Sequence, residues 1–409
     1  MLDGLLRFGA LMLRAGNPSF RVREATGLLA RHFAIDSLAL EVSLNGMTAT
    51  ARRGKEHATL AVDVAPLGIN VWRMGALSRV VEEAPSNPKL AGLTLATLAA
   101  RLDAIEAVPP LHPAVVVAVA VGLASASFAY LNGGSVPALI AAFIAGGLGQ
   151  MLRGLLLGRR LNQYAVTALC AVVAAGLFCL IATLQDRTGI GRNSAAGFIS
   201  SVLFLVPGFP LVAALLDLLQ HQMVPGIARL AYGMLLLLAA AFGLSIVATV
   251  AGLTVTAPPP PAEGMAVTLA LRGLASFVGG CGFSILYNSS WRTVLTVGAL
   301  ALLGNELRLG LHDLGLGLPP ATFIGALTVG LLASVVDSSL REPRISFTVP
   351  GIIIMVPGLY AFQTVVQFAQ GNALAGLEAA VLTGFVVGAM ALGLVAARFI
   401  TERRWLVES

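Results

Sequence analysis

The chain has 409 residues, of which 57% are hydrophobic and only 11% charged, with a formal net charge of +6 and a mean hydropathy of +0.87. A soluble domain carries about 25% charged residues, so this composition excludes an ordinary soluble protein and indicates a protein of the lipid bilayer. It also argues against a nucleic-acid-binding protein, because the basic residues beyond Leu111 lie in short loops between apolar runs, as membrane topology requires.

Residues 1–110 resemble a water-soluble domain in composition, since 12 of the 26 Lys and Arg and 10 of the 20 Asp and Glu precede Leu111. Apolar residues recur at helical spacing from Leu2 to Phe33, and the break at Gly16-Asn17-Pro18 divides them into two short helices. Charged residues interrupt the opening segment, which therefore lacks the apolar core of a signal peptide and predicts a cytoplasmic domain. The sequence predicts a small α/β domain that continues with strands at 38–45, 47–53 and 58–65 and helices at 69–83 and 90–105.

Beyond this domain, apolar runs follow one another to the end of the chain, and each approaches the roughly 20 residues that a membrane span needs. The expected fold class is a mainly α polytopic membrane protein of about ten transmembrane helices. With residues 1–110 inside, ten arginines, Arg153 among them, fall on the inside and three, including Arg308, on the outside. This bias predicts a bacterial inner-membrane protein with both termini in the cytoplasm. The expected spans are 112–131, 136–152, 165–184, 194–217, 227–253, 264–286, 293–310, 320–337, 347–368 and 374–398.

Short sequence matches recur in the same order in the two halves of the membrane region, roughly 150 residues apart. Five spans are an odd number, so a second copy would have the opposite orientation, as in secondary transporters that work by alternating access. The expected domains are therefore residues 1–110, a first repeat at 111–256 and a second at 257–409, with Pro258 to Pro261 as a stiff linker. The matches join Gly122–Ser125 to Gly273–Ser276, Leu148–Arg153 to Leu303–Arg308, Val206–Gly208 to Val356–Gly358 and Ala241–Leu244 to Ala391–Leu394.

Pro-Gly pairs interrupt the fourth and ninth spans. Proline removes a backbone donor and clashes with the preceding turn, so these helices should be kinked or unwound near the middle of the membrane. Freed backbone groups in hydrocarbon need partners, and equivalent breaks in two halves therefore point to a substrate site, although a packing kink is the alternative. The expected substrate-binding residues are Pro207, Gly208, Phe209, Pro210, Pro350, Gly351, Pro357, Gly358 and Gln363.

Four charged residues within or at the ends of spans are candidates for coupling or gating, because ionisable groups at membrane depth are rare and functional. Arg272 and Glu306 have matching estimated depths, which predicts that they interact, either as a structural ion pair or as a gate. Asp217 ends the fourth span and Arg229 begins the fifth. The two could form a hairpin pair or take part in coupling.

No catalytic, cofactor or metal site is predicted. Cys170, Cys179 and Cys281 all lie in apolar runs and are expected to be packing residues. No set of His, Cys, Asp and Glu clusters on one span, which argues against a membrane-embedded enzyme. The remaining classes are a transporter, a passive channel, and a ligand sensor with a membrane anchor, and ten spans with a repeat exceed what an anchor requires.

Six longer motifs lie along the chain, at Arg14–Asn17, Arg21–Glu24, Val206–Val212, Asp217–Leu219, Gly226–Leu230 and Val349–Gly358. In these motifs the chain resembles the threonine/serine exporter family in its single-chain form. The resemblance implies a five-plus-five inner-membrane exporter with a cytoplasmic N-terminal domain, which moves threonine and serine with the proton motive force. Split two-subunit relatives are linked to dicarboxylate export. The chain departs from the family pattern at Gln220-His221-Gln222, where a glycine-containing polar turn is expected.

Together the sequence predicts a secondary active exporter of small polar amino acids, with export of small dicarboxylates or passive facilitation as alternatives. Its expected partners are a small-molecule substrate and the lipid bilayer, without nucleic acid. The sequence leaves open whether the chain forms a homo-oligomer.

Overall fold

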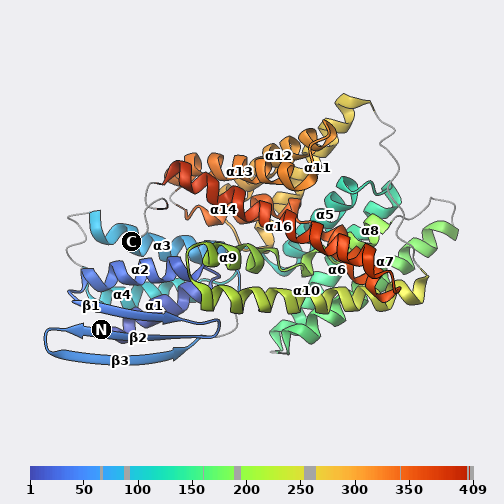
Figure 1. The fold of residues 1–409 in the computed structure, drawn as a ribbon. Helices are drawn as coiled ribbons and strands as arrows, with labels where there is room; N and C mark the ends of the chain where they lie inside the picture. The colour runs from blue at the N-terminus through green and yellow to red at the C-terminus, as the bar shows by residue number, and fades with distance from the viewer. Residues whose placement is uncertain are drawn as a thin grey trace.

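A computed structural model describes residues 1–64, 68–86, 93–159, 161–187, 195–252, 264–340, 342–402 and 405. A small α/β domain forms one end of the molecule, and long helices extend away from it (Figure 1). The expected linker Pro258 to Pro261 lies outside the described residues, as do the first residues of the helix expected at 90–105.

The N-terminal domain has the elements that its sequence predicts. Its three strands form one antiparallel sheet in the order β1-β2-β3, with Leu38 opposite Ala51. Helix α1 packs on this sheet, and Arg7 on α1 reaches Glu106 and Asp103 of α4 at 2.5 and 2.6 Å. Hydrogen bonds to Glu106 and Asp103 raise the pKa of Arg7. The elements are α1 Leu2–Arg14, α2 Ser19–His32, β1 Ser37–Val42, β2 Gly46–Arg53, β3 Glu56–Asp63, α3 Val71–Ser86 and α4 Leu95–Ala107.

The remaining described residues form the apolar helices of a multi-pass membrane protein. Eight of these helices are long and apolar enough to cross a membrane, and a pair bent by 51° at Pro357 makes up to nine. The predicted count of ten is therefore confirmed only in part, because the segment Leu203–Leu219 is a shorter apolar helix. The first half contains α5 Ala114–Leu131, α6 Val136–Gly158, α7 Gln163–Arg187, α8 Ala195–Ser200, η2 Leu203–Leu205, α9 Gly208–Leu219 and α10 Met223–Ala251. The second half contains α11 Met265–Leu286, α12 Trp291–Asp313, α13 Leu318–Leu340, α14 Ile345–Ile352, η3 Ile353–Met355, α15 Gly358–Ala369 and α16 Ala373–Thr401.

Both predicted breaks at Pro207 and Pro357 are present and have the same local geometry. Pro207 precedes α9 with φ −80° and ψ 52°, and Pro357 precedes α15 with φ −79° and ψ 56°. In each, the following glycine donates a hydrogen bond to the carbonyl two residues back, at 2.8 Å. The expected break at Pro350 is wrong, because α14 continues through this residue to Ile352 and changes to a 3-10 turn only afterwards.

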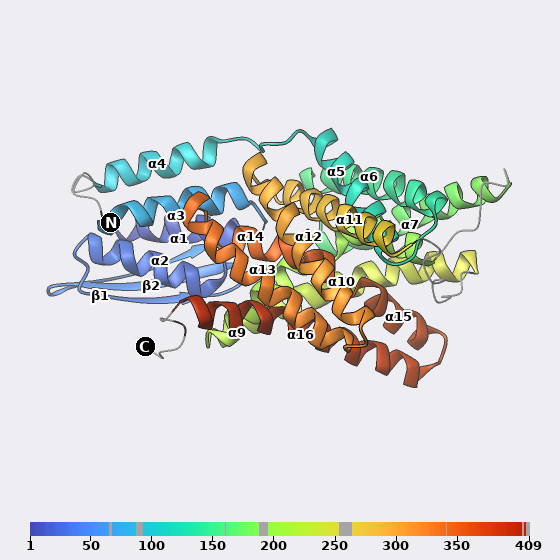
Figure 2. The same ribbon diagram turned by 90° about the horizontal axis from the view of Figure 1, so that it is seen from above.

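Helices α5 and α11, the first long apolar helix of each half, pack against each other in antiparallel orientation. The segment just before α5 meets the segment just after α11, where Leu111 N–H donates to the Asn288 side-chain oxygen at 2.7 Å. The two helices cross closely, because a Cβ on Gly282 would lie 2.5 Å from the Ala120 carbonyl oxygen. At the other end of each half, α10 leads away from the N-terminal domain and α16 leads back towards it (Figures 1 and 2).

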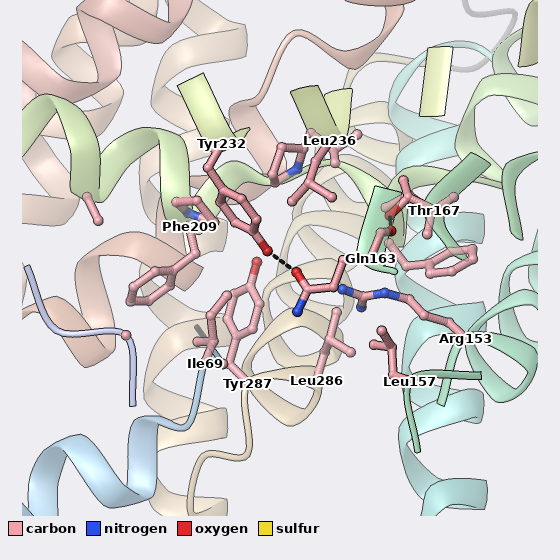
Figure 3. A pocket seen from close by; sticks show the side chains of 18 of the residues that line it. Ile69, Arg153, Leu157, Gln163, Thr167, Phe209, Tyr232, Leu236, Leu286 and Tyr287 are labelled. Atoms are coloured by element: carbon pink, nitrogen blue, oxygen red, sulfur yellow. Dashed lines mark hydrogen bonds between the residues drawn. The ribbon is translucent and has the colours of Figure 1, made fainter. Parts of the chain in front are cut away.

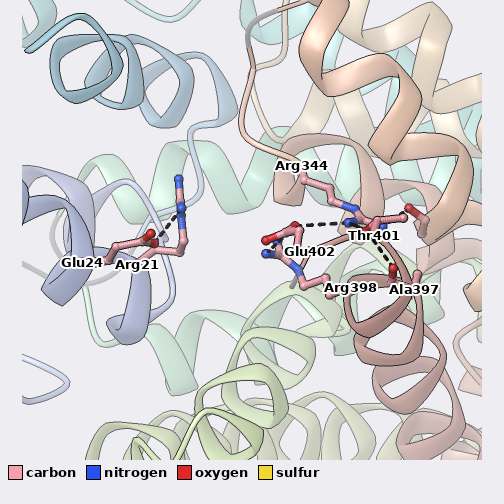
Figure 4. Close-up of polar contacts among 8 residues, drawn as sticks. Arg21, Glu24, Arg344, Ala397, Arg398, Thr401 and Glu402 are labelled. Carbon is pink, nitrogen blue, oxygen red and sulfur yellow. Dashed lines mark hydrogen bonds and ion pairs between the residues drawn. The ribbon is translucent and has the colours of Figure 1, made fainter. Parts of the chain in front are cut away.

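The end of α16 is anchored beside the N-terminal domain. Arg344, at the start of α14, donates to Thr401 Oγ1 at 2.7 Å and pairs with Glu402 at 3.2 Å, and Figure 4 shows this cluster facing helix α2. The Trp405 ring carries the Arg398 guanidinium 4.7 Å from its centre and makes an edge contact with Phe20 at 5.4 Å. The C-terminal segment therefore lies at the same end of the molecule as the N-terminal domain.

Candidate functional site

A cavity of about 280 Å³ lies between the N-terminal domain, the first helix break and helices α6, α7, α10 and α11 (Figure 3). Backbone of the N-terminal domain at Gly16, Gly68 and Ile69 forms one wall. Gly16 has φ +103°, a conformation that suits glycine, and a Cβ there would also lie 3.0 Å from the Gly68 carbonyl. The cavity is thus closed on one side by two loops that are tightly packed together.

Arg153 is the charged group that enters this cavity from α6. Figure 3 shows its guanidinium extending towards Gln163 and Tyr287. Among the residues that the structure describes, none forms a hydrogen bond or an ion pair with this guanidinium. Gln150 lies one helical turn earlier on α6 and also lines the cavity, and its buried Oε1 has no hydrogen-bond partner. The cavity therefore contains a cation and an acceptor to which the other described residues supply no hydrogen bond.

Neutral polar groups complete the opposite wall of the cavity. Tyr232 donates a hydrogen bond to Gln163 Oε1, which fixes both side chains (Figure 3). Thr167 donates to the Gln163 carbonyl at 2.7 Å, so its hydroxyl is engaged within α7. Tyr287, at the end of α11, makes an edge contact with Phe209 at 5.5 Å. No carboxylate is among the described side chains that line the cavity, whereas two arginines, Arg153 and Arg229, are.

The two helix breaks lie against each other, but only the first lines the cavity. Pro207, Phe209 and Pro210 are lining residues. A Cβ on Gly208 would meet the Ile353 side chain at 2.9 Å, so the second broken segment packs directly behind the first.

The expected site residues of the second half lie outside this cavity. A Cβ on Gly358 would instead lie 3.5 Å from the Phe128 ring and 3.9 Å from the Leu203 side chain. The other four, Pro350, Gly351, Pro357 and Gln363, are also not among the lining residues.

Asp217 and Arg229 form a buried ion pair at the junction with the N-terminal domain. Their side chains are 0% and 3% exposed, and Arg229 Nη1 lies 3.6 Å from Asp217 Oδ2. Each also binds the N-terminal domain: Phe20 N–H donates to Asp217 Oδ1 at 3.2 Å, and Arg229 Nη2 donates to the Asn17 carbonyl at 3.1 Å. The two residues thus form the ion pair that was one of the two expectations, and both contact the N-terminal domain; a part in coupling stays a prediction.

Arg272 forms a different ion pair from the one that the sequence predicts. Its guanidinium pairs with Asp313 at the end of α12. The predicted interaction with Glu306 takes a weaker form, because the Arg272 charge acts on the Glu306 carboxylate without an ion-pair contact between them among the described residues. Asp313 lies two helical turns beyond Glu306, at the end of α12. Its side chain is half-exposed there, so the pair with Arg272 forms without burying both charges. Glu306 is half-buried, and its Oε1 has no hydrogen-bond partner. Neither Arg272 nor Glu306 lines the cavity.

The sequence prediction missed Arg153, Gln163, Tyr232 and Tyr287. It ended the second span at residue 152 and so assigned Arg153 to a loop, whereas α6 continues to Gly158. The match between Leu148–Arg153 and Leu303–Arg308 was the available signal, because a repeated arginine near the end of a span is unusual. Among the described residues, no group of three or more His, Cys, Asp or Glu is placed to hold a metal ion.

The bundle of apolar helices, the paired helix breaks and the polar cavity are features of membrane transport proteins. Residues 3–251 match the family model described as "Putative threonine/serine exporter", and residues 272–400 match "Threonine/Serine exporter, ThrE". The chain belongs to the threonine/serine exporter family, which confirms the resemblance seen in its motifs.

The names of the relatives refer to two different kinds of substrate. A "Probable threonine/serine exporter" of Mycobacterium tuberculosis is 24% identical over 91% of this chain and 70% of that protein. The "Probable succinate transporter subunit YjjP" of Escherichia coli K12 is 29% identical over 61% of this chain and 93% of that protein. The Klebsiella aerogenes protein of the same name is 29% identical over 59% of this chain and 90% of its own length. No solved structure matches the chain.

Proposed function

We propose that this protein is a secondary active transporter that exports small polar amino acids of the threonine and serine type through the cavity beside Arg153. The observation that carries the proposal is the pair of unengaged groups there. Within the described residues, the Arg153 guanidinium has no protein partner and the Gln150 amide oxygen accepts no hydrogen bond. A cation and a buried acceptor that both lack partners inside a protein are costly to keep unless a ligand uses them.

An amino acid matches these two groups. A guanidinium binds a carboxylate through two parallel hydrogen bonds, and the Gln150 oxygen accepts a hydrogen bond from an ammonium or hydroxyl group. Helix α9 begins at Gly208 beside the cavity, and the positive end of its dipole also favours a carboxylate. The volume of about 280 Å³ lies just below the usual range for ligand sites, which begins at about 300 Å³, and this suits a small metabolite.

The substrate crosses by alternating access between two halves of opposite orientation. The matching break geometries and the antiparallel α5 and α11 support this inverted repeat. Ten spans would require that residues 195–219 also cross the membrane as a broken span, in addition to the bent pair at Pro357. The N-terminal domain and the end of α16 lie at the same end of the molecule, which supports two cytoplasmic termini in the inner membrane (Figure 1). The proton motive force supplies the energy.

A dicarboxylate is the second candidate substrate, because two relatives are named as succinate transporter subunits. A second carboxylate would need a second cation, and Arg229 lines the same cavity as Arg153. Arg229 is already paired with Asp217 at 3.6 Å, however, so the cavity offers one unpaired cation among its described lining residues. This favours a substrate with a single carboxylate.

Efflux from proteoliposomes tests the proposal. Labelled serine, threonine and succinate are loaded separately, and efflux is measured with and without a pH gradient. Arg153→Gln should lower amino-acid efflux by at least about tenfold, since it removes a charge-assisted bond to the substrate. Arg159→Gln makes the same charge change at the exposed end of α6 and should transport normally.

The outcomes separate the candidates. Equal amino-acid efflux by Arg153→Gln and Arg159→Gln would show that the cavity is not the substrate site. Efflux that a protonophore leaves unchanged and that never runs uphill would identify a passive facilitator. Transport of succinate without serine or threonine would replace the amino acid by a dicarboxylate.

A further inference from the structure

Arg308 occupies, in the second half, the position that Arg153 has in the first. Both lie near the end of their helix, on α12 and α6. Each follows an amide side chain by one helical turn, Asn305 in α12 and Gln150 in α6. The two arginines are the same number of residues apart as the two amides. Thr167 on α7 and Thr322 on α13 are also separated by this number of residues. The two halves thus repeat a group of arginine, amide and threonine across two helices.

The two groups are in different states. Arg308 Nη1 donates to Asn305 Oδ1 at 3.0 Å and Nε donates to Thr322 Oγ1 at 3.1 Å. Arg153 makes neither of the equivalent bonds to Gln150 or Thr167, and its side chain lies in the cavity instead. One arginine is therefore held by its neighbours while the other is available.

Only neutral groups hold Arg308 within the part of the chain that the structure describes. Asn305 Nδ2 donates to Ser276 Oγ at 2.9 Å, which orients the Asn305 oxygen towards the guanidinium. The nearby carboxylate of Asp313 pairs with Arg272 and not with Arg308. A guanidinium whose charge is met only by dipoles can exchange them for a carboxylate, because a charge-assisted hydrogen bond is about twice as strong as a neutral one.

Arg153 and Arg308 lie towards opposite ends of the membrane region. The Arg153 side chain lines the cavity, and Gly16 of the N-terminal domain lines the same cavity. Helix α12 begins beside the start of α5, where the His112 ring packs against Trp291 at 5.0 Å, next to the N-terminal domain. Because Arg308 is near the other end of α12, it lies on the far side of the helix breaks from that domain.

We propose that Arg308 is a second carboxylate-binding site, closed in this conformation and open when the transporter faces the other side. The inference rests on the proposed function. When the halves exchange conformations, Gln150 and Thr167 hold Arg153 as Asn305 and Thr322 now hold Arg308. The amino-acid carboxylate is then bound by one arginine before crossing and by the other before release.

Serine binding and serine exchange separate the two arginines. Binding is measured on the detergent-solubilised protein, and exchange is measured in proteoliposomes with equal serine on both sides. Arg308→Gln should bind serine within about twofold of the wild type, because the Arg153 cavity is intact, but should exchange it at least about tenfold more slowly. Arg292→Gln is the matched control, since it removes an exposed arginine at the start of the same helix.

Exchange by Arg308→Gln at the rate of the Arg292→Gln control would overturn the inference. Thr322→Val keeps Arg308 but removes the hydrogen bond from Arg308 to the Thr322 hydroxyl. This variant replaces Arg308→Gln in the test if Arg308→Gln does not fold. Its exchange should change by at least about threefold with serine binding retained, and an unchanged rate would equally overturn the inference. A wild-type protein that neither binds nor exchanges serine, threonine or succinate would instead refute the proposed function.

Discussion

The buried pair Asp217–Arg229 should be strongly coupled in stability. With 0% and 3% of their side chains exposed, removing one partner leaves the other as an uncompensated buried charge, which costs about 3–5 kcal/mol. The loss of stability in Asp217→Leu should be near the lower limit of this range, because Arg229 keeps its 3.1 Å hydrogen bond to the Asn17 carbonyl. The double variant with Arg229→Met removes both charges and should be less destabilised than either single variant.

The assay is a double-mutant cycle on the midpoint of detergent-driven unfolding, followed by tryptophan fluorescence. The reference cycle uses Arg21→Met and Glu24→Leu, because that pair on α2 is partly exposed at 22% and 34% and should contribute only about 0–1 kcal/mol. If the two single effects at Asp217 and Arg229 simply add in the double variant, the reasoning about an uncompensated charge is refuted.

The same double variant decides between the two roles that the sequence left open. If Asp217 and Arg229 only fasten the N-terminal domain, a folded variant without either charge should still transport serine. If they participate in coupling, it should lose uphill transport while remaining folded. The contacts of the pair with Asn17 and Phe20 favour the fastening role.

Three further predictions concern packing, the helix breaks and topology. Gly243→Ala places a methyl group 2.6 Å from a backbone carbonyl of α7 and should destabilise by about 1–3 kcal/mol in the same unfolding assay, whereas Gly388→Ala, which meets nothing within 4 Å, should not. Pro207→Ala and Pro357→Ala restore a backbone donor at the breaks, so export should fall in variants that still insert and fold; wild-type export by both would count against the breaks as the transport site. A reporter fused after Ser409 should be active only as a cytoplasmic fusion, and activity confined to the periplasm would reverse the topology.

Local patterns were sufficient to predict the N-terminal domain. Its strands and helices depend on alternation, on helical spacing and on turns such as Asn45-Gly46, which are all properties of neighbouring residues. The boundaries moved by a few residues, as at β1, which ends at Val42 and not at Asn45. Such shifts depend on packing partners that a local pattern does not contain.

The site was only partly predictable, because it depends on which side chains meet across helices. The breaks at Pro207 and Pro357 followed from proline chemistry, and the structure has both. The mean hydropathy of the sequence, however, predicted that the second span ends before Arg153. An arginine lowers the mean hydropathy of a segment equally whether its side chain faces lipid or a polar cavity. Depth estimates placed Arg272 near Glu306, but they did not show that Arg272 makes its ion pair two helical turns further along α12, with Asp313.

The positions where the two halves differ show what each end of the molecule requires. The hairpin between α9 and α10 meets the N-terminal domain and contains the buried Asp217–Arg229 pair. At the corresponding place between α15 and α16 stand Gln367 and Ala379, and Gln367 accepts a hydrogen bond from Asn372 at 3.0 Å within its own hairpin. The buried ion pair is therefore present in the hairpin that meets the N-terminal domain, and the residues at the same two positions of the other hairpin are uncharged. By contrast, Arg153 and Arg308 are retained in both halves, which is expected of residues that meet the same substrate from its two sides.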